Sequence, residues 1–170
     1  MNRKSVIKHI LAEAVGNPIL VEQYELQDII APIIKEMRGL ISQAQQKFPT
    51  IKSIALKVES GKLERTSLDD VKEIWLDLNH IFTKIFKLRN EMQKEMKESF
   101  GDEPMPQELA KLTVSDSYRY ISNAQAMSRR AFKHCCFESA DSTIEDAEMC
   151  EHYMDELSKV LYQITKGMLY

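Results

Sequence analysis

The stretch that decides the fold runs from Ser67 to Phe100 and reads SLDDVKEIWLDLNHIFTKIFKLRNEMQKEMKESF. Apolar side chains recur in it at alternating steps of three and four residues, a spacing that places them on one face of an α-helix. This seam consists of Val71, Ile74, Leu78, Ile81, Ile85, Leu88 and Met92. The pattern predicts one long amphipathic helix of about 50 Å, at roughly 1.5 Å per residue.

Both ends of this helix carry boundary signals. Ser67 followed by Asp70 is close to a capping box, with Asp in place of Glu. Gly101 and the two prolines that follow it, Pro104 and Pro106, predict the end of the helix. A compact globule of this length has a radius of gyration of only about 15 Å. The helix therefore belongs to an elongated bundle, or it projects toward a partner.

The rest of the chain shows the same helical periodicity. Helices are expected over residues 3–15, 18–47, 51–60, 115–137 and from 142 to the end, and no strand pattern occurs. Pro32 predicts a kink or break near residues 28–31. The short turn before residue 142 predicts an antiparallel C-terminal hairpin. We expect an all-α, elongated bundle of five to six helices, forming one domain over residues 1–170 with a hinge candidate at 101–107.

Composition narrows the classes of function. The net charge is −3, so nothing in the overall balance drives the chain toward nucleic acid or an acidic membrane. Three cysteines, an odd number, argue against a disulfide framework and favour a reducing, cytoplasmic location. No apolar run reaches the roughly 18 residues of a membrane span. Metal-binding Glu-x-x-His and Cys-x-x-Cys patterns are absent, and we expect no metal and no cofactor.

Charge is segregated in the last third of the chain. Residues 111–134 are basic with a single acid, Asp116, whereas residues 138–156 are acidic without Lys or Arg. One interpretation is that the two segments form a hairpin whose charges complement each other. The alternative is a nucleoprotein subunit that binds phosphates through the basic helix. The residues of that alternative are Arg119, Arg129, Arg130 and Lys133.

A second alternative rests on Arg129 and His134, which are spaced as Arg-x4-His. With the final amphipathic helix that follows, this segment resembles the end of a HEPN domain. The resemblance covers about the last 55 residues and implies an all-α ribonuclease of a toxin or phage-defence system. It implies that His134 is the general acid or base and that Arg129 stabilises the phosphate. Positions five apart point about 140° away from each other on a helix, so Arg130 and His134 are the pair that share a face.

Our leading expectation is a non-enzymatic interaction protein that works through helix-face contacts. It would be a small subunit, adaptor or inhibitor of a larger assembly, or a homodimer. Aromatic side chains and methionines on and beside the seam of the long helix are most simply core residues, and they are also the anchors for a partner if one face stays open. These residues are Trp75, Phe82, Phe86, Met92 and Met96.

Overall fold

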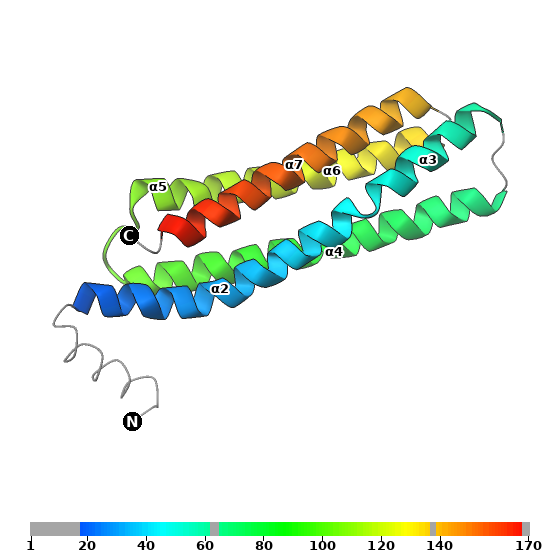
Figure 1. The fold of residues 1–170 in the computed structure, drawn as a ribbon. Helices are drawn as coiled ribbons and strands as arrows, with labels where there is room; N and C mark the ends of the chain where they lie inside the picture. Colours follow the sequence, from blue (N-terminus) through cyan, green and yellow to red (C-terminus); the bar gives the residue numbers. More distant parts are fainter. Residues whose placement is uncertain (1–17, 62–64, 137–138, 168–170) are drawn as a thin grey trace.

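The computed structural model describes residues 18–61, 65–136 and 139–167, without the side chains of residues 18–25, 65–68 and 136. These residues form helices joined by short turns and contain no strand. Figure 1 shows an elongated bundle of antiparallel rods. The predicted all-α fold is therefore confirmed, while the helix expected over residues 3–15 lies outside the described residues.

The described residues form four rods. Figure 1 shows that these rods alternate in direction along the chain. The first consists of α2 (Pro18–Gln45) and α3 (Phe48–Glu59), and the second is α4 (Arg65–Phe100). The third consists of α5 (Gln107–Ala110), a π-helical turn η1 (Lys111–Asp116) and α6 (Ser117–Cys136). The fourth is α7 (Ala140–Gly167), which forms the predicted antiparallel hairpin with α6.

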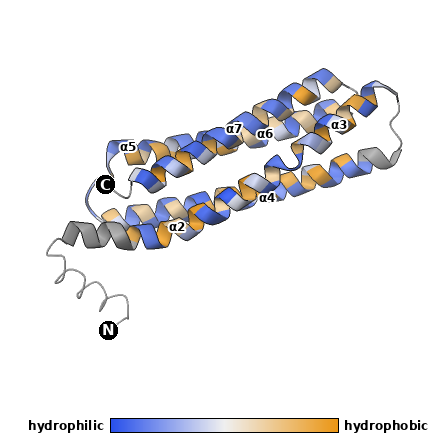
Figure 2. Cartoon of the chain, viewed as in Figure 1, coloured by the Kyte–Doolittle hydropathy of each residue, from blue (hydrophilic) through white to orange (hydrophobic). Residues whose placement is uncertain are grey.

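The predicted seam of α4 is the side of this helix that lies in the core. All seven residues are buried except Ile74, which is half-buried. Apolar and polar residues alternate around the rods in Figure 2, as expected of helices that each bury one face. Burying each large side chain contributes about 1.5–3 kcal/mol. The other rods run alongside α4 over most of its length, so the long helix is one wall of an elongated bundle and does not project from it.

Several helix boundaries differ from the expected ones, and α3 begins at Phe48, three residues before the expected start at Ile51. α4 begins at Arg65, before the predicted cap Ser67, and α7 begins at Ala140 instead of Ser142. The third rod begins at Gln107, eight residues before the predicted start at Ser115. The reason lies in η1, because a π-turn holds one more residue than an α-turn and interrupts the three-and-four spacing.

Pro32 lies inside α2, and the helix continues through it without the predicted break. Proline removes one backbone hydrogen bond, the one to the carbonyl of Asp28. Asp28 and Pro32 are both on the exposed side, where the carbonyl is open to solvent and its lost bond costs little. Ile30 and Ile34 are buried on the opposite side and hold the helix to its neighbours.

Glycine ends α4 as predicted. Gly101 has φ +55°, a left-handed conformation that other residues rarely adopt, and its N–H donates to the carbonyl of Glu98. The polar turn of residues 101–106 then leads into α5. Within the described ranges, no helix combines the length and the apolar character needed to cross a membrane.

Candidate functional site

The arginine–histidine pair predicted for catalysis is not brought together. His134 Nδ1 lies 2.7 Å from Oδ2 of Asp146, which α7 contributes. The arginine that joins them is Arg130, whose Nη2 lies 3.3 Å from Asp146 Oδ1. Arg129 is exposed and makes no ion pair with any described residue. The pair that shares a face, Arg130 and His134, therefore meets at Asp146, and we call these three residues the Asp146 site.

The Asp146 site has a buried centre and a partly exposed rim. The side chain of Asp146 is 4% exposed, whereas those of His134 and Arg130 are 30% and 59% exposed. A carboxylate only accepts hydrogen bonds, so the proton of the short contact lies on His134 Nδ1. No described residue bonds Nε2, the second ring nitrogen. A carboxylate that holds imidazole in this tautomer is the arrangement that general-base catalysis uses.

Asp146 was missed because it sits among many exposed acids of α7. Its helical spacing distinguishes it from the other acids of α7, since Asp146 follows Thr143 by three residues and precedes Cys150 by four. Both of those residues are fully buried. An acid at these spacings lies on the buried face and requires a partner there. This signal is present in the sequence.

A buried cation lies toward the other end of α6. Arg89 of α4 is 6% exposed, and its Nη2 donates to the carbonyl oxygens of Val114 at 2.7 Å and Thr113 at 3.3 Å. Its Nε donates to Ser117 Oγ, which in turn donates to the carbonyl of Thr113. No described acid pairs with this guanidinium, and burial lowers its pKa, a shift that Tyr118 opposes. Arg89 satisfies carbonyls of the π-turn, so its role is structural.

Three of the five predicted partner anchors are core residues. Phe82, Met92 and Met96 are fully buried, and Thr113 Oγ1 donates to the sulfur of Met96 at 3.5 Å. The expectation that they face a partner is therefore wrong, because α2 and the third rod cover this part of α4. Trp75 and Phe86 are only half-buried, and both lie on the side of α4 that faces α6.

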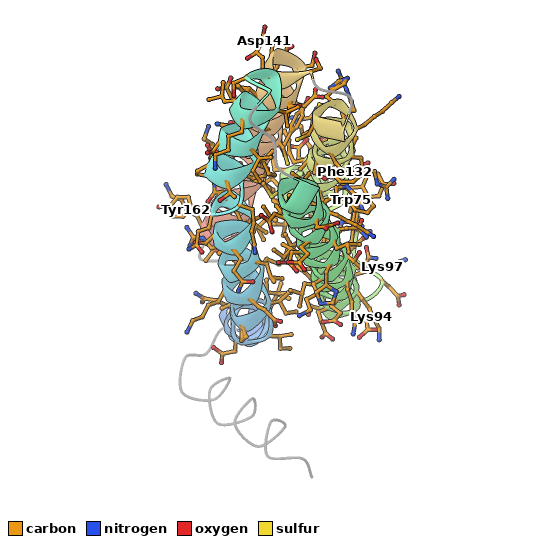
Figure 3. All side chains as sticks on the ribbon, turned by 90° about the vertical axis from the view of Figure 1, so that its right-hand side faces the viewer. Trp75, Lys94, Lys97, Phe132, Asp141 and Tyr162 are labelled. Atoms are coloured by element: carbon orange, nitrogen blue, oxygen red, sulfur yellow. The ribbon has the colours of Figure 1, made fainter. Side chains whose placement is uncertain are left out.

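Three side-chain pairs join the outer edges of α4 and α6. Trp75 stacks on Phe132 with ring centroids 4.9 Å apart, and Phe86 meets Tyr118 edge-on at 5.7 Å. Gln125 donates to Asn79 between them at 3.3 Å. Figure 3 shows Trp75 and Phe132 beside each other, with Lys94 and Lys97 on the same side of the molecule.

We call this surface the α4–α6 face. On α4 it consists of one row at steps of three and four, Lys72, Leu76, Asn79, Thr83, Phe86, Asn90, Lys94 and Lys97, with Trp75 at its inner edge. On the third rod it consists of Val114, Tyr118, Ser122, Gln125, Arg129, Phe132 and Lys133.

The arginines and lysine predicted for nucleic-acid binding fall into two groups. Arg129 and Lys133 lie exposed on the α4–α6 face and make no ion pair with the described residues. Arg119 pairs with Asp116 at 3.3 Å and lies over the ring of Tyr120, while Arg130 pairs with Asp146.

Charge complementarity across the hairpin accounts for only part of the charge on α6. The ion pair from Arg130 to Asp146 spans the hairpin as expected. Glu148 and Glu151 instead approach Lys52 of α3, at 3.9 and 2.6 Å. The acids of α7 thus form ion pairs with both α3 and α6, so some cations of α6 have no acidic partner among the described residues.

Comparison with known proteins adds nothing to this geometry: no model of a protein family, no curated protein and no solved structure matches the chain. In the described part of the chain, no three side chains of His, Cys, Asp or Glu are grouped to hold a metal ion. The fold and its surface define an antiparallel helical bundle with one aromatic and basic face.

Proposed function

We propose that this chain is a non-enzymatic helical-bundle interaction protein, a subunit or adaptor, and that the α4–α6 face meets its partner. One observation carries the proposal. Of the six large hydrophobic side chains that the described residues expose, three lie on this face: Leu76, Val114 and Tyr118. Exposed apolar side chains that share one face with half-buried aromatic rings favour an interaction surface.

The composition of the α4–α6 face supports binding and not catalysis. Its side chains are aromatic, aliphatic, amide, hydroxyl and cationic, and none of them is a His, Cys, Asp or Glu. Such groups anchor and orient a partner, because Trp, Tyr and Arg provide most of the energy at interfaces. The rings are held by each other and by two packed helices, so little conformational entropy is lost on binding.

Site-directed photo-crosslinking tests this proposal. A photoreactive phenylalanine analogue replaces Tyr118, and the control replaces Tyr162, since these tyrosines are 53% and 57% exposed and Tyr162 belongs to α7. In cells that produce the protein, we expect a discrete cross-linked species from position 118 and none from position 162. Equal cross-linking from both positions, or none from position 118, would contradict the proposal.

A second candidate function is cleavage of RNA at the Asp146 site, and the 2.7 Å contact between His134 and Asp146 favours it. His134 Nε2 would take the proton of a ribose 2′-hydroxyl, whose oxygen forms a bond to the adjacent phosphorus while the bond to the 5′ oxygen breaks. The 5′ oxygen would leave as a hydroxyl, taking its proton from water. Arg130 would stand beside the phosphate in the place first expected for Arg129.

Purified protein and a labelled RNA test this second candidate. We expect His134→Ala to abolish cleavage, and Asp146→Asn to slow it by about a hundred-fold because the imidazole loses its fixed tautomer. Arg38→Ala is the matched control, because Arg38 is an exposed arginine of α2 that belongs neither to the Asp146 site nor to the α4–α6 face, and it leaves the rate unchanged. Cleavage that survives His134→Ala overturns this candidate.

A further inference from the structure

Positive charge accumulates along the α4–α6 face. Lys72, Lys94 and Lys97 occupy the α4 row, which contains no Asp or Glu, and α6 contains no acidic residue at all. Lys94 alone among these lysines has an ion pair, with Glu98 of its own helix at 3.7 Å. From Lys72 to Lys97 the row extends over roughly 40 Å, at 1.5 Å per residue. A chain with a net charge of −3 thus presents one long face with excess positive charge.

Aromatic rings lie between these cations. Tyr118 is the most exposed ring of the face, with the half-buried Phe86, Trp75 and Phe132 along the same edge. The indole N–H of Trp75 is buried and bonds no described residue, which makes this ring the least satisfied group of the face. Rings alternating with cations are the arrangement that receives a charged backbone together with flat, unpaired bases.

We infer that the partner of the α4–α6 face is single-stranded nucleic acid, an inference that rests on the function proposed above for this face. Phosphates contact Arg129, Lys133 and the lysines of α4, and a base stacks on the exposed ring of Tyr118. A duplex offers the same charge but keeps its bases stacked within the helix, so it gains less from the rings. An acidic protein offers carboxylates to the cations but no repeating row of flat bases to the rings.

Fluorescence anisotropy of a labelled oligothymidylate of about 20 nucleotides measures this binding. Trp75 is the only tryptophan of the chain and lies at the inner edge of the face, so its emission reports binding independently. We expect saturable binding at low salt, quenching of Trp75 emission, and weaker binding to a duplex of the same sequence.

Neutralising two cations locates the site. The variant carries Arg129→Gln and Lys133→Gln, and the matched control carries Lys35→Gln and Arg38→Gln, two exposed positions of α2. We expect the first variant to bind about ten-fold more weakly, with a salt slope smaller by about 1.4, since each phosphate contact on a single strand contributes about 0.7. The control binds like the unmodified chain. Tyr118→Ala weakens single-strand binding and leaves duplex binding unchanged.

Each remaining outcome overturns the inference. If both double variants lose the same affinity for the oligothymidylate, the attraction is non-specific. If the protein binds duplex DNA or polyglutamate as tightly as the single strand, the aromatic rings take no part in binding. Absence of oligonucleotide binding also overturns it. In that case a protein cross-linked through position 118 would show that the face binds a partner of another class, and the proposed function would stand.

Discussion

Arg89 and Asp146 are two buried charges at opposite ends of the contact surface of α6, and their surroundings differ. Arg89 donates hydrogen bonds to backbone carbonyls of η1, and the helical backbone of η1 fixes the positions of these carbonyls. Asp146 is held by the side chains of Arg130 and His134, which are partly exposed. A buried charge whose partners are backbone carbonyls, as at Arg89, stabilises the fold. A buried charge whose partners are solvent-accessible side chains, as at Asp146, leaves a group that can react at the surface, here the imidazole of His134.

The largest effect is expected at Arg89. Arg89→Met keeps an apolar stem but removes the guanidinium that donates to the carbonyls of Thr113 and Val114, and only the Thr113 carbonyl keeps a side-chain donor, Ser117. We expect the free energy of unfolding in urea to fall by about 3 kcal/mol, with faster amide exchange in residues 111–116. Lys87→Met, an exposed change on the same helix, is the control and costs less than about 0.5 kcal/mol. A loss as small as that control for Arg89→Met would show that the carbonyls do not depend on the guanidinium.

A smaller effect is expected at Asp146. In Asp146→Ala the side chains of Arg130 and His134 lose their acceptor, but both reach water. We expect unfolding in urea to become easier by about 1.5 kcal/mol. Glu145→Ala, an exposed acid beside it, serves as the control. A loss equal to that of Arg89→Met would refute the distinction between the two charges.

The smallest effect concerns Cys150, a buried group that stays uncharged. Its Sγ donates to the carbonyl of Ala124 at 3.1 Å, and burial raises the pKa of this thiol. Above the ordinary value of 9.0 the unfolded chain loses the thiol proton while the folded chain keeps it. Stability therefore falls as pH rises, by roughly 1 kcal/mol between pH 8 and pH 10.

Cys150→Ala separates this titration from that of lysines and tyrosines. The difference in unfolding free energy between the two proteins should shrink over the same pH range. A difference that stays constant with pH would mean that the thiol ionises equally well in both states, and hence that the α6–α7 contact is open to water.

Much of the fold could be predicted because the core depends on spacing. On α4 the seam residues from Val71 to Met92 are buried, except the half-buried Ile74, at the positions that their three-and-four steps indicate. On α7 the residues at the same steps from Ala147 to Ile164 are buried as well. The start of the third rod could not be predicted in the same way, since η1 shifts the register between Leu109 and Ile121. Periodicity describes regular helices and gives no warning of one wide turn.

The candidate sites were harder to predict for a different reason. Arg89 continues the buried row between Ile85 and Met92, and Asp146 continues the buried row that contains Cys150. Helical spacing therefore predicts that both charged side chains are buried. The carbonyl partners of Arg89 and the side-chain partners of Asp146 come from other helices. The spacing of residues within one helix does not indicate which carbonyl or histidine of another helix will be the partner. The burial of Phe82 and Met96 likewise depends on how long the neighbouring rods are.

The π-turn has a consequence for how this chain tolerates insertions and deletions. A wide turn already contains one residue beyond the regular repeat, so deleting a single residue from 111–116 would restore ordinary winding and leave both flanking helices in phase with their neighbours. The same deletion anywhere else in the four rods would rotate every later side chain of that rod by about 100°. Within the helical rods, variation in length should therefore concentrate in this one turn, with Arg89 changing alongside it.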